Sequence, residues 1–287
     1  MNIANKIVLG TVQFGLPYGI NNNVGKISQS EVAKILSEAK KNEISLIDTS
    51  YAYGDSEIVI GSIPKASREF KIVSKLPRTT KKPKVVFNET IHRLKTNKLY
   101  GYLIHHFDYF KENLSIWTEI KSLKEDGQVE KIGFSLYSTL ELEYLFSKNI
   151  EFDIVQIPYN ILDRAFAPYL KELKQHNVEI HARSVFLQGL FFKSTDDLPD
   201  RLQPLKPYLM TMDKFCSEHD ITIESLALNG VLHNPDIDGV LIGVDSLTQL
   251  QKNIQSVWSK MPVGVSKFIQ LLDVKEKELL NPVNWNI

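Results

Sequence analysis

Residues 44–57, ISLIDTSYAYGDSE, join a short apolar run to a polar loop that contains a glycine. The run from Ser45 to Asp48 is typical of a buried strand that carries an acid at its carboxyl end. Gly54 permits a sharp turn of the backbone, and the Ser-Glu pair after it begins a helical pattern. We therefore expect Asp48 and Tyr53 to lie together where a strand leaves a sheet.

The same alternation of strand and helix continues along the chain. Ser28 followed by Glu31 is a capping-box pattern, and the apolar face after it predicts a helix that leads into the 44–57 strand. Strands are predicted at residues 7–10, 45–48, 71–75, 100–105, 131–135, 152–156, 178–184 and 239–243. Eight strands that alternate with helices predict a single-domain (β/α)₈ TIM barrel over residues 1–287, with functional residues at the carboxyl ends of the strands.

The longest interruption of this alternation lies between residues 184 and 239. It contains Pro199, Pro204 and Pro207 and is too irregular for a simple link from strand to helix. Long loops in compact domains are often functional. This segment is predicted to be a flap over a cofactor or substrate.

Composition excludes several classes of function. The chain of 287 residues has 34 basic and 34 acidic side chains, so no net charge attracts nucleic acid or an acidic membrane. There is no signal-peptide pattern, and no run approaches the roughly 20 apolar residues of a membrane span. Cys216 is the only cysteine, which fits a structural role and a reducing compartment. We expect a cytoplasmic protein with no nucleic-acid or membrane partner and no metal site; the sequence leaves its oligomeric state open.

Two other predicted strands end in residues that can move a proton. The run 70–75, FKIVSK, ends in Lys75, and the run 102–106, YLIHH, ends in two histidines. A phenol has a pKa of about 10, and a neighbouring ammonium favours its ionised form. Lys75 could act on Tyr53 in this way, with Asp48 holding the lysine in place, and an imidazole could polarise a carbonyl oxygen.

In this order and at strand ends, these residues resemble the Asp-Tyr-Lys-His set of the aldo-keto reductases. The resemblance implies hydride transfer between a nicotinamide cofactor and the carbonyl or alcohol carbon of a small molecule. It implies that Tyr53 donates the proton and that His105 positions the carbonyl. Lys75 would tune the phenol, and Asp48 would anchor Lys75.

The chain has neither a GxGxxG sequence after a strand nor a Walker sequence, so a dinucleotide would have to lie on the barrel rim. The resemblance places Thr11 under the nicotinamide and Ser135 and Gln156 on its carboxamide, although Leu136 replaces the usual asparagine. Arg183, followed by Ser184, stands where the family often has an aromatic residue that stacks on the nicotinamide. A planar guanidinium can stack as well. Backbone amides from Leu187 to Leu190, which include Gly189, would contact the pyrophosphate.

The last predicted strand ends at Gly243 and leads to a helix that begins near Ser246, where a helix N-terminus suits a phosphate. Asn253 matches a family residue that contacts adenine. Gln249 stands where many NADPH-specific members have an arginine, and Asp245 would repel a 2′-phosphate. The resemblance favours NADP(H), and these two residues leave NAD(H) as the alternative.

The resemblance leaves the substrate and two other functions open. Candidate pocket residues are Tyr51, His106, Phe107 and Trp285. Residues 182–190, ARSVFLQGL, resemble the corresponding segment of bacterial family members that act in surface-sugar pathways, and this resemblance implies a sugar carbonyl as substrate. One alternative is a non-enzymatic regulatory subunit that senses the cofactor. The other is an epimerase or isomerase with tightly held NAD.

Overall fold

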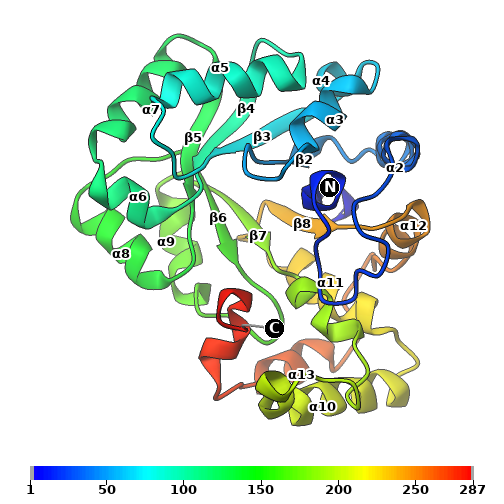
Figure 1. Ribbon diagram of the computed structural model, residues 1–287. Helices are drawn as coiled ribbons and strands as arrows, with labels where there is room; N and C mark the ends of the chain where they lie inside the picture. Colours follow the sequence, from blue (N-terminus) through cyan, green and yellow to red (C-terminus); the bar gives the residue numbers. More distant parts are fainter. Residues whose placement is uncertain (1–2, 286–287) are drawn as a thin grey trace.

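The computed structural model describes residues 3–285 and contains a closed barrel of parallel strands. Each strand pairs with the next in sequence, and the last pairs with the first (Figure 1). The strands are β1 (Ile7–Gly10), β2 (Leu46–Asp48), β3 (Lys71–Leu76), β4 (Leu99–Ile104), β5 (Val129–Ser135), β6 (Ile154–Pro158), β7 (Glu179–Arg183) and β8 (Gly239–Gly243). The predicted (β/α)₈ barrel in a single domain is confirmed, with strand ends that differ by a few residues.

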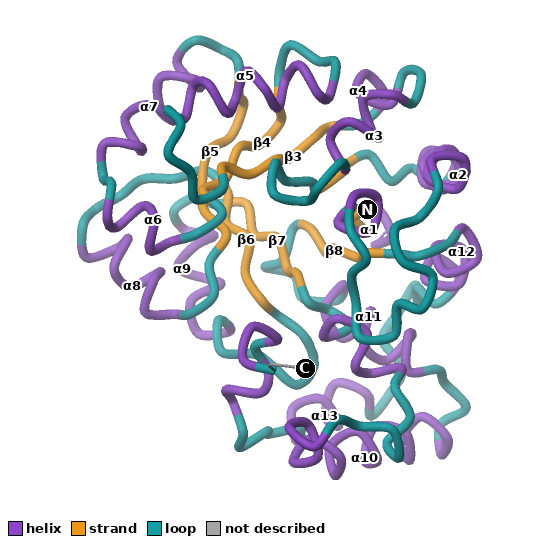
Figure 2. The backbone as a smooth tube through the Cα atoms, viewed as in Figure 1, coloured by secondary structure: helices purple, strands orange, loops and turns teal. Residues whose placement is uncertain are grey.

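Helices surround the strands, and loops join the two sets of elements at both ends of the barrel (Figure 2). The α-helices are α1 (Val12–Gly15), α2 (Gln29–Lys41), α3 (Ser56–Ser62), α4 (Ala66–Glu69), α5 (Pro83–Leu94), α6 (Phe107–Glu112), α7 (Ser115–Glu125), α8 (Thr139–Ser147), α9 (Leu170–Gln175), α10 (Lys206–Glu218), α11 (Ile223–Leu232), α12 (Leu247–Gln255) and α13 (Val265–Leu271). Short 3₁₀ helices are η1 (Ile3–Lys6), η2 (Ala167–Tyr169), η3 (Leu187–Phe192), η4 (Asp200–Leu205), η5 (Lys277–Leu280) and η6 (Pro282–Asn284).

Helix α2 begins where the capping pattern predicts, but half of the pattern has a different partner. The Ser28 hydroxyl accepts a hydrogen bond from the Glu31 amide at 3.3 Å, as an N-cap does. The carboxylate of Glu31 accepts instead from the amide of Leu247, at 2.8 Å, at the start of α12. This bond joins helices α2 and α12.

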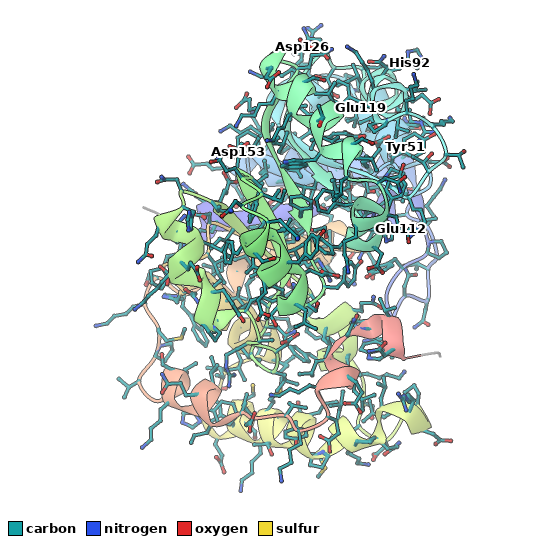
Figure 3. All side chains as sticks on the ribbon, turned by 90° about the vertical axis from the view of Figure 1, so that its left-hand side faces the viewer. Tyr51, His92, Glu112, Glu119, Asp126 and Asp153 are labelled. Atoms are coloured by element: carbon teal, nitrogen blue, oxygen red, sulfur yellow. The ribbon has the colours of Figure 1, made fainter. Side chains whose placement is uncertain are left out.

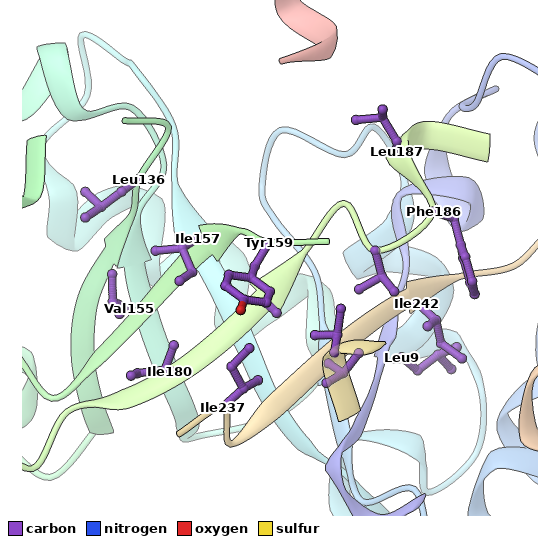
Figure 4. Packing of buried hydrophobic residues seen from close by; sticks show 14 of the residues in the cluster. Leu9, Leu136, Val155, Ile157, Tyr159, Ile180, Phe186, Leu187, Ile237 and Ile242 are labelled. Atoms are coloured by element: carbon purple, nitrogen blue, oxygen red, sulfur yellow. The ribbon is translucent and has the colours of Figure 1, made fainter. Parts of the chain in front are cut away.

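Apolar side chains fill two layers of the barrel. Inside it, five buried side chains form a compact cluster: Val8, Leu46, Val73, Leu103 and Ile154. Between strands and helices lies a larger cluster, part of which appears in Figure 4. Burial of such a side chain stabilises a fold by about 1.5–3 kcal/mol, so this layer fixes the strand ends that carry the polar residues described below.

A charged cluster replaces apolar packing near the amino ends of β4, β5 and β7. Tyr100 donates to Glu179 at 2.6 Å, Lys131 pairs with the same carboxylate, and His181 Nε2 lies 2.6 Å from its other oxygen. Burial alone would raise the pKa of Glu179, but these partners outweigh it and lower the pKa to about 2. A Cβ at residue 239 would lie 2.6 Å from the His181 ring, so Gly239 makes room for this cluster.

The prediction of a flap between residues 184 and 239 is wrong for most of that segment. It contains η3, η4 and two helices, α10 and α11, of which α10 packs on α13 through rings of Phe215 and Phe268 whose centroids are 3.8 Å apart. Pro207 stands in the first turn of α10, where its missing N–H breaks no helical bond. Cys216 is buried on the same helix, and burial raises the pKa of its thiol to about 11, which fits the predicted structural role.

Candidate active site

A cavity of about 440 Å³ opens at the carboxyl ends of the strands. The structure brings together on its wall many residues that the sequence singled out: Thr11, Asp48, Tyr53, His105, Ser135, Gln156, Arg183, Ser184, Gly189, Gly243, Gln249 and Asn253. Most of them are the last residues of strands or the first residues after them. The parallel barrel therefore gathers at one end side chains that are far apart in sequence.

Lys75 lies fully buried beneath the cavity. Its Nζ donates to Asp48 Oδ1 at 2.5 Å, to the carbonyl oxygen of Thr49 at 2.9 Å and to the Tyr53 hydroxyl at 3.3 Å. Burial lowers the pKa of Lys75, and the charge of Asp48 opposes that shift. Asp48 Oδ2 accepts from Gln156 Nε2 at 2.8 Å, so each carboxylate oxygen has a donor.

The Tyr53 phenol lies on the cavity wall and is held in its neutral form. Burial, followed by the negative charge of Asp48, raises the pKa of Tyr53 well above its usual value. The expectation of a lowered pKa is therefore not met, because burial and the charge of Asp48 dominate. A neutral phenol is nevertheless the state that a proton donor requires.

His105 lies beside the phenol with its ring nearly perpendicular to that of Tyr53, at 5.7 Å between ring centroids. Its Nδ1 is 3.1 Å from the Ser50 hydroxyl. Burial, followed by the charge of Lys75, lowers the pKa of His105 well below its usual value. The imidazole is therefore neutral at physiological pH and carries a single N–H.

Two glycines allow residues 11–16, which follow β1, to pack closely against the loop of Tyr53, residues 49–55. A Cβ on Gly15 would lie 1.8 Å from the carbonyl oxygen of Tyr53, and one on Gly54 would lie 2.6 Å from the carbonyl oxygen of Gly15. Gly54 has φ of +53°, a conformation that favours glycine. The Ser56 hydroxyl also donates to the carbonyl oxygen of Thr11 at 2.9 Å. Sequence reasoning assigned a turn to Gly54 but found no signal for the role of Gly15.

Arg183 ends β7 and stacks on an aromatic ring that the sequence analysis missed. Its guanidinium carbon lies 4.1 Å from the ring centroid of Tyr137, which follows β5 and also lines the cavity. One Nη donates to the carbonyl oxygen of Leu136 at 3.0 Å and the other to the Ser184 hydroxyl at 3.3 Å. Tyr137 could have been suspected, because it lies two residues after the strand-end residue Ser135.

The segment after Arg183 has an unusual backbone. Ser184, Leu187 and Gln188 have φ of +61°, +47° and +52°, values that L-residues rarely adopt. Hydrogen bonds from the loop between α1 and α2 hold it: the amide of Ile20 donates to Gln188 at 3.1 Å and the Asn21 side chain to Gly189 at 2.6 Å. Figure 2 shows that loop in teal.

Leu187 does not line the cavity through its side chain. The side chain is fully buried and lies among the apolar residues drawn in Figure 4. The contact predicted from residues 187–190 concerns backbone amides, and of this segment Gln188 and Gly189 reach the cavity wall.

The amino end of α12 is occupied by groups of the protein itself. Ser246 is its N-cap and accepts from the amide of Gln249 at 3.2 Å, while Glu31 accepts from Leu247. The amide of Asp245 donates to the Gln249 side chain at 2.7 Å. Two carboxylates, those of Glu31 and Asp245, therefore lie where the sequence analysis expected a phosphate. Ser246 itself is not on the cavity wall.

The four predicted substrate residues lie outside the cavity wall. Tyr51 points towards α5, where its hydroxyl donates to Glu89 at 2.6 Å and its ring lies 3.9 Å from the guanidinium of Arg93. Figure 3 shows Tyr51 on that side of the molecule. Trp285 is buried and donates to Leu279 at 2.7 Å.

The other two candidates follow β4. His106 is exposed, with its ring centroid 4.7 Å from that of His105. Phe107 is buried in an aromatic group with Phe110 and Phe134. Besides Tyr53 and His105, the aromatic residues on the wall are Tyr18, Tyr137, Phe186 and Phe192.

The buried Asp48-Lys75-Tyr53 chain beside a neutral imidazole, at the mouth of an eight-stranded barrel, fits the family that the sequence resembles. Residues 6–264 match the model of the Aldo/keto reductase family. The chain belongs to the aldo/keto reductase family. It is therefore an oxidoreductase of a family that uses nicotinamide cofactors.

Curated relatives and a solved structure are similar over most of the chain. L-galactose dehydrogenase of Arabidopsis thaliana is 23% identical over 269 residues, which are 85% of this chain and 83% of the relative. The NADH-specific methylglyoxal reductase of Escherichia coli K12 is 25% identical over 267 residues, 77% of this chain and 80% of the relative. The aldo-keto reductase AKR11C1 from Bacillus halodurans, in its holo form, superposes with a TM-score of 0.72 at 20% identity, covering 93% of this chain and 92% of that one.

Two kinds of feature are absent from residues 3–285, a membrane-spanning helix and a metal-binding cluster. None of the helices in this range is both long and apolar enough to cross a membrane. Within the same range, no group of three or more His, Cys, Asp or Glu side chains is arranged to hold a metal ion.

Proposed function

We propose that this aldo/keto reductase reduces an aldehyde or ketone to an alcohol, with Tyr53 as the proton donor. The observation that carries the proposal is the position of Lys75, whose ammonium contacts both Asp48 and the Tyr53 hydroxyl directly behind the cavity. As negative charge develops on a carbonyl oxygen, the phenol gives up its proton. The ammonium then stabilises the phenolate that remains.

His105 and Asp48 have supporting roles in this proposal. The neutral imidazole offers its N–H to the carbonyl oxygen and holds it beside Tyr53. Asp48 keeps the buried lysine charged, because an isolated ammonium at this depth would lose its proton. The low pKa of His105 makes it a hydrogen-bond donor rather than a competing acid near neutrality.

The cavity fits a nicotinamide dinucleotide, which would supply the hydride. The wall of the cavity runs from Tyr53 to Asn253 on α12. Gln13 also lines it, and the buried Oε1 of this side chain has no hydrogen-bond partner within residues 3–285. We propose that Thr11, Ser135 and the segment from Ser184 to Gly189 hold the cofactor, with Gly243, Gln249 and Asn253 around its adenosine. Gln156 has a second task, since its amide also orients Asp48.

We further propose that NADH is preferred over NADPH, the reverse of the sequence-based preference. The observation behind this is the pair of carboxylates, Glu31 and Asp245, at the amino end of α12. Carboxylates accept hydrogen bonds from ribose hydroxyls and repel a 2′-phosphate. The similarity to an NADH-specific relative supports the same choice.

The test is a steady-state assay of NADH and NADPH oxidation with simple aldehydes, keto sugars and nucleotide sugars; the sugar arm follows from the relative named L-galactose dehydrogenase. We expect turnover with NADH at a higher kcat/KM than with NADPH. Copurified NAD with product formation but no net absorbance change would identify an epimerase or isomerase instead. Cofactor binding without turnover of any compound would favour a regulatory subunit.

A further inference from the structure

Arg183 is a cation of the cavity wall whose charge acts on the carboxyls of Asp163 and Glu141, although within residues 3–285 neither of them forms an ion pair with it. Its two hydrogen bonds go to neutral acceptors, the Leu136 carbonyl and the Ser184 hydroxyl. Among residues 3–285 no carboxylate forms an ion pair with it, and its buried Nε has no hydrogen-bond partner. A guanidinium has five N–H groups, so three of them have no acceptor within the described protein.

The guanidinium lies at the reacting end of the cavity. Burial is the largest influence on the pKa of all three neighbours: it raises the pKa of Tyr53 and lowers those of Lys75 and His105. The positive charge of Arg183 lowers each of the three pKa values, so it opposes the effect of burial at Tyr53 and adds to it at Lys75 and His105. The carboxylate at this end, Asp48, is already bonded to Lys75 and Gln156. The positive charge of Arg183 is therefore not balanced by the groups around the phenol.

The stack on Tyr137 fixes the plane of the guanidinium. A fixed plane with free N–H groups suits an oxyanion, because two parallel hydrogen bonds can form to a carboxylate or a phosphate. If Arg183 only stacked against a cofactor ring, it would need the flat face of its guanidinium but not the N–H groups that lack an acceptor. Arg183 is partly buried and its charge has no ion-pair partner within the described residues, which favours a ligand that supplies an opposite charge.

We propose that Arg183 binds an oxyanion carried by the carbonyl substrate, so that the enzyme acts on aldehydes or ketones with a carboxylate or phosphate group. This inference rests on the proposed carbonyl reduction and specifies its substrate class. It assigns to Arg183 a recognition role beyond the stacking that the family resemblance implies.

The first test compares matched substrates. Succinic semialdehyde is set against butanal, and glyceraldehyde 3-phosphate against glyceraldehyde, with kcat/KM measured for each. We expect the wild type to prefer the anion at least tenfold in one pair, and Arg183→Met to lower that ratio at least tenfold. Arg183→Lys keeps the positive charge but not the planar guanidinium with its paired donors, so we expect it to retain part of the preference for the anion. A wild-type ratio near one in both pairs would overturn the proposal.

A control variant separates this site from the general charge of the cavity. Lys252 is an exposed cation of α12 that also borders the cavity. Lys252→Met removes one positive charge as Arg183→Met does, but it should leave the ratio within about twofold of the wild type. Equal loss of the ratio in both variants would show that long-range attraction, rather than binding at Arg183, selects anions.

The second test does not depend on turnover. Calorimetric titration of the protein, free and with NADH, with butanoate and inorganic phosphate is compared with titration with butanamide. We expect an anion to bind the wild type and to bind Arg183→Met at least tenfold more weakly. If anions bind through Arg183 while no carbonyl compound is reduced, the proposed function fails and the anion site stands. If butanal is reduced while anions bind both proteins equally, the anion site fails alone.

Discussion

Lys75 uses all three donors of its ammonium group inside the protein. They reach an acid, a backbone carbonyl and the phenol that faces the cavity. Since no donor is left over, the lysine has one stable position. That position couples the state of Asp48 to the proton of Tyr53.

Tyr53→Phe is expected to abolish carbonyl reduction and to leave cofactor affinity nearly unchanged. The variant removes the proton donor but keeps the ring, and general acid catalysis is worth about 10² to 10⁴-fold. Single-turnover kinetics measures the loss of carbonyl reduction. Fluorescence titration measures the dissociation constant of NADH. Tyr137→Phe is the control, because it removes a phenol hydroxyl that is not bonded to Lys75. More than about a tenth of wild-type turnover in Tyr53→Phe, with hydride transfer rate-limiting, would exclude the phenol as the acid.

Lys75→Met is expected to lose activity and stability together. It leaves the Asp48 carboxylate buried without its ammonium, and breaking a buried pair in this way costs about 3–5 kcal/mol of unfolding free energy. Urea denaturation at neutral pH measures the loss. The double variant Asp48→Asn with Lys75→Met should recover most of the stability and none of the activity. A double variant as unstable as the single one would attribute the loss to packing rather than to charge.

At this scale the sequence predicts which residues gather, and it fails on the direction of side chains. Asp48, Lys75 and His105 could be placed because each lies within one residue of the carboxyl end of a strand. Tyr51 and Trp285 could not, because whether a loop or tail residue faces the cavity depends on distant partners such as Arg93. The effect of burial on the pKa of a phenol is likewise invisible in the sequence.

Helix α12 has its amino end capped by a residue of α2. Glu31 reaches the amide of Leu247 across 216 positions of the chain. The carboxylate thereby satisfies a donor that would otherwise be free to bind a phosphate. Under the proposed preference for NADH, this capping carboxylate would make the amino end of α12 unfavourable to the 2′-phosphate of NADPH.

Changing Glu31→Gln together with Asp245→Asn is expected to shift cofactor preference towards NADPH. Both substitutions keep an acceptor oxygen but remove the negative charge. We expect the ratio of the NADPH and NADH dissociation constants to fall about tenfold or more, which corresponds to about 1.4 kcal/mol. Fluorescence titration with each cofactor measures it. Glu38→Gln, at the other end of α2, is a matched control; a shift of equal size there would refute a local effect.

Sequence patterns located both helices but misassigned the partner of Glu31. The capping box is a local pattern, and Ser28 does cap α2 as predicted. The carboxylate of Glu31 accepts a hydrogen bond from the first amide of α12 instead of from the amide of Ser28. Local patterns cannot reveal such a competitor, since it arises only when the barrel closes.

The charged cluster around Glu179 joins strands β4, β5 and β7 near their amino ends. Hydrogen bonds and charges from His181, Lys131 and Tyr100 keep this acid ionised. The pKa in the folded state is about 2, below the value of 4.5 expected without these contacts. The contribution to stability is therefore fully present above pH 4.5 and is lost as the pH falls towards 2.

Glu179→Gln is expected to destabilise the protein at neutral pH but progressively less in acid. After allowance for partial exposure, the pKa shift corresponds to about 2 kcal/mol. Urea unfolding of both proteins at several pH values, from neutral down to the acid limit of folding, measures the difference. It should shrink below about pH 4.5, since the wild type then loses what the variant lacks. If the difference in unfolding free energy did not change with pH, the loss of stability would be due to packing rather than to the ionised carboxylate.

At the largest scale the fold was the most predictable property. Alternating strands and helices repeat eight times, and parallel pairing follows from connections of that length. The segment from 184 to 239 was misjudged because its prolines suggested a loop. Pro207 begins a helix, and the packing of α10 on α13 depends on ring contacts between distant residues.

The close approach of Gly15 to the loop of Tyr53 has a consequence for engineering by loop exchange. Barrels of this kind invite grafting of one loop at a time, because each loop follows its own strand. Here residues 11–16 and the tyrosine loop interlock, and a side chain at position 15 would overlap the backbone of Tyr53. A donor loop carried into one position alone would displace the phenol before any substrate contact changed. The two segments can therefore be transplanted only as a pair, although a complete helix separates them along the chain.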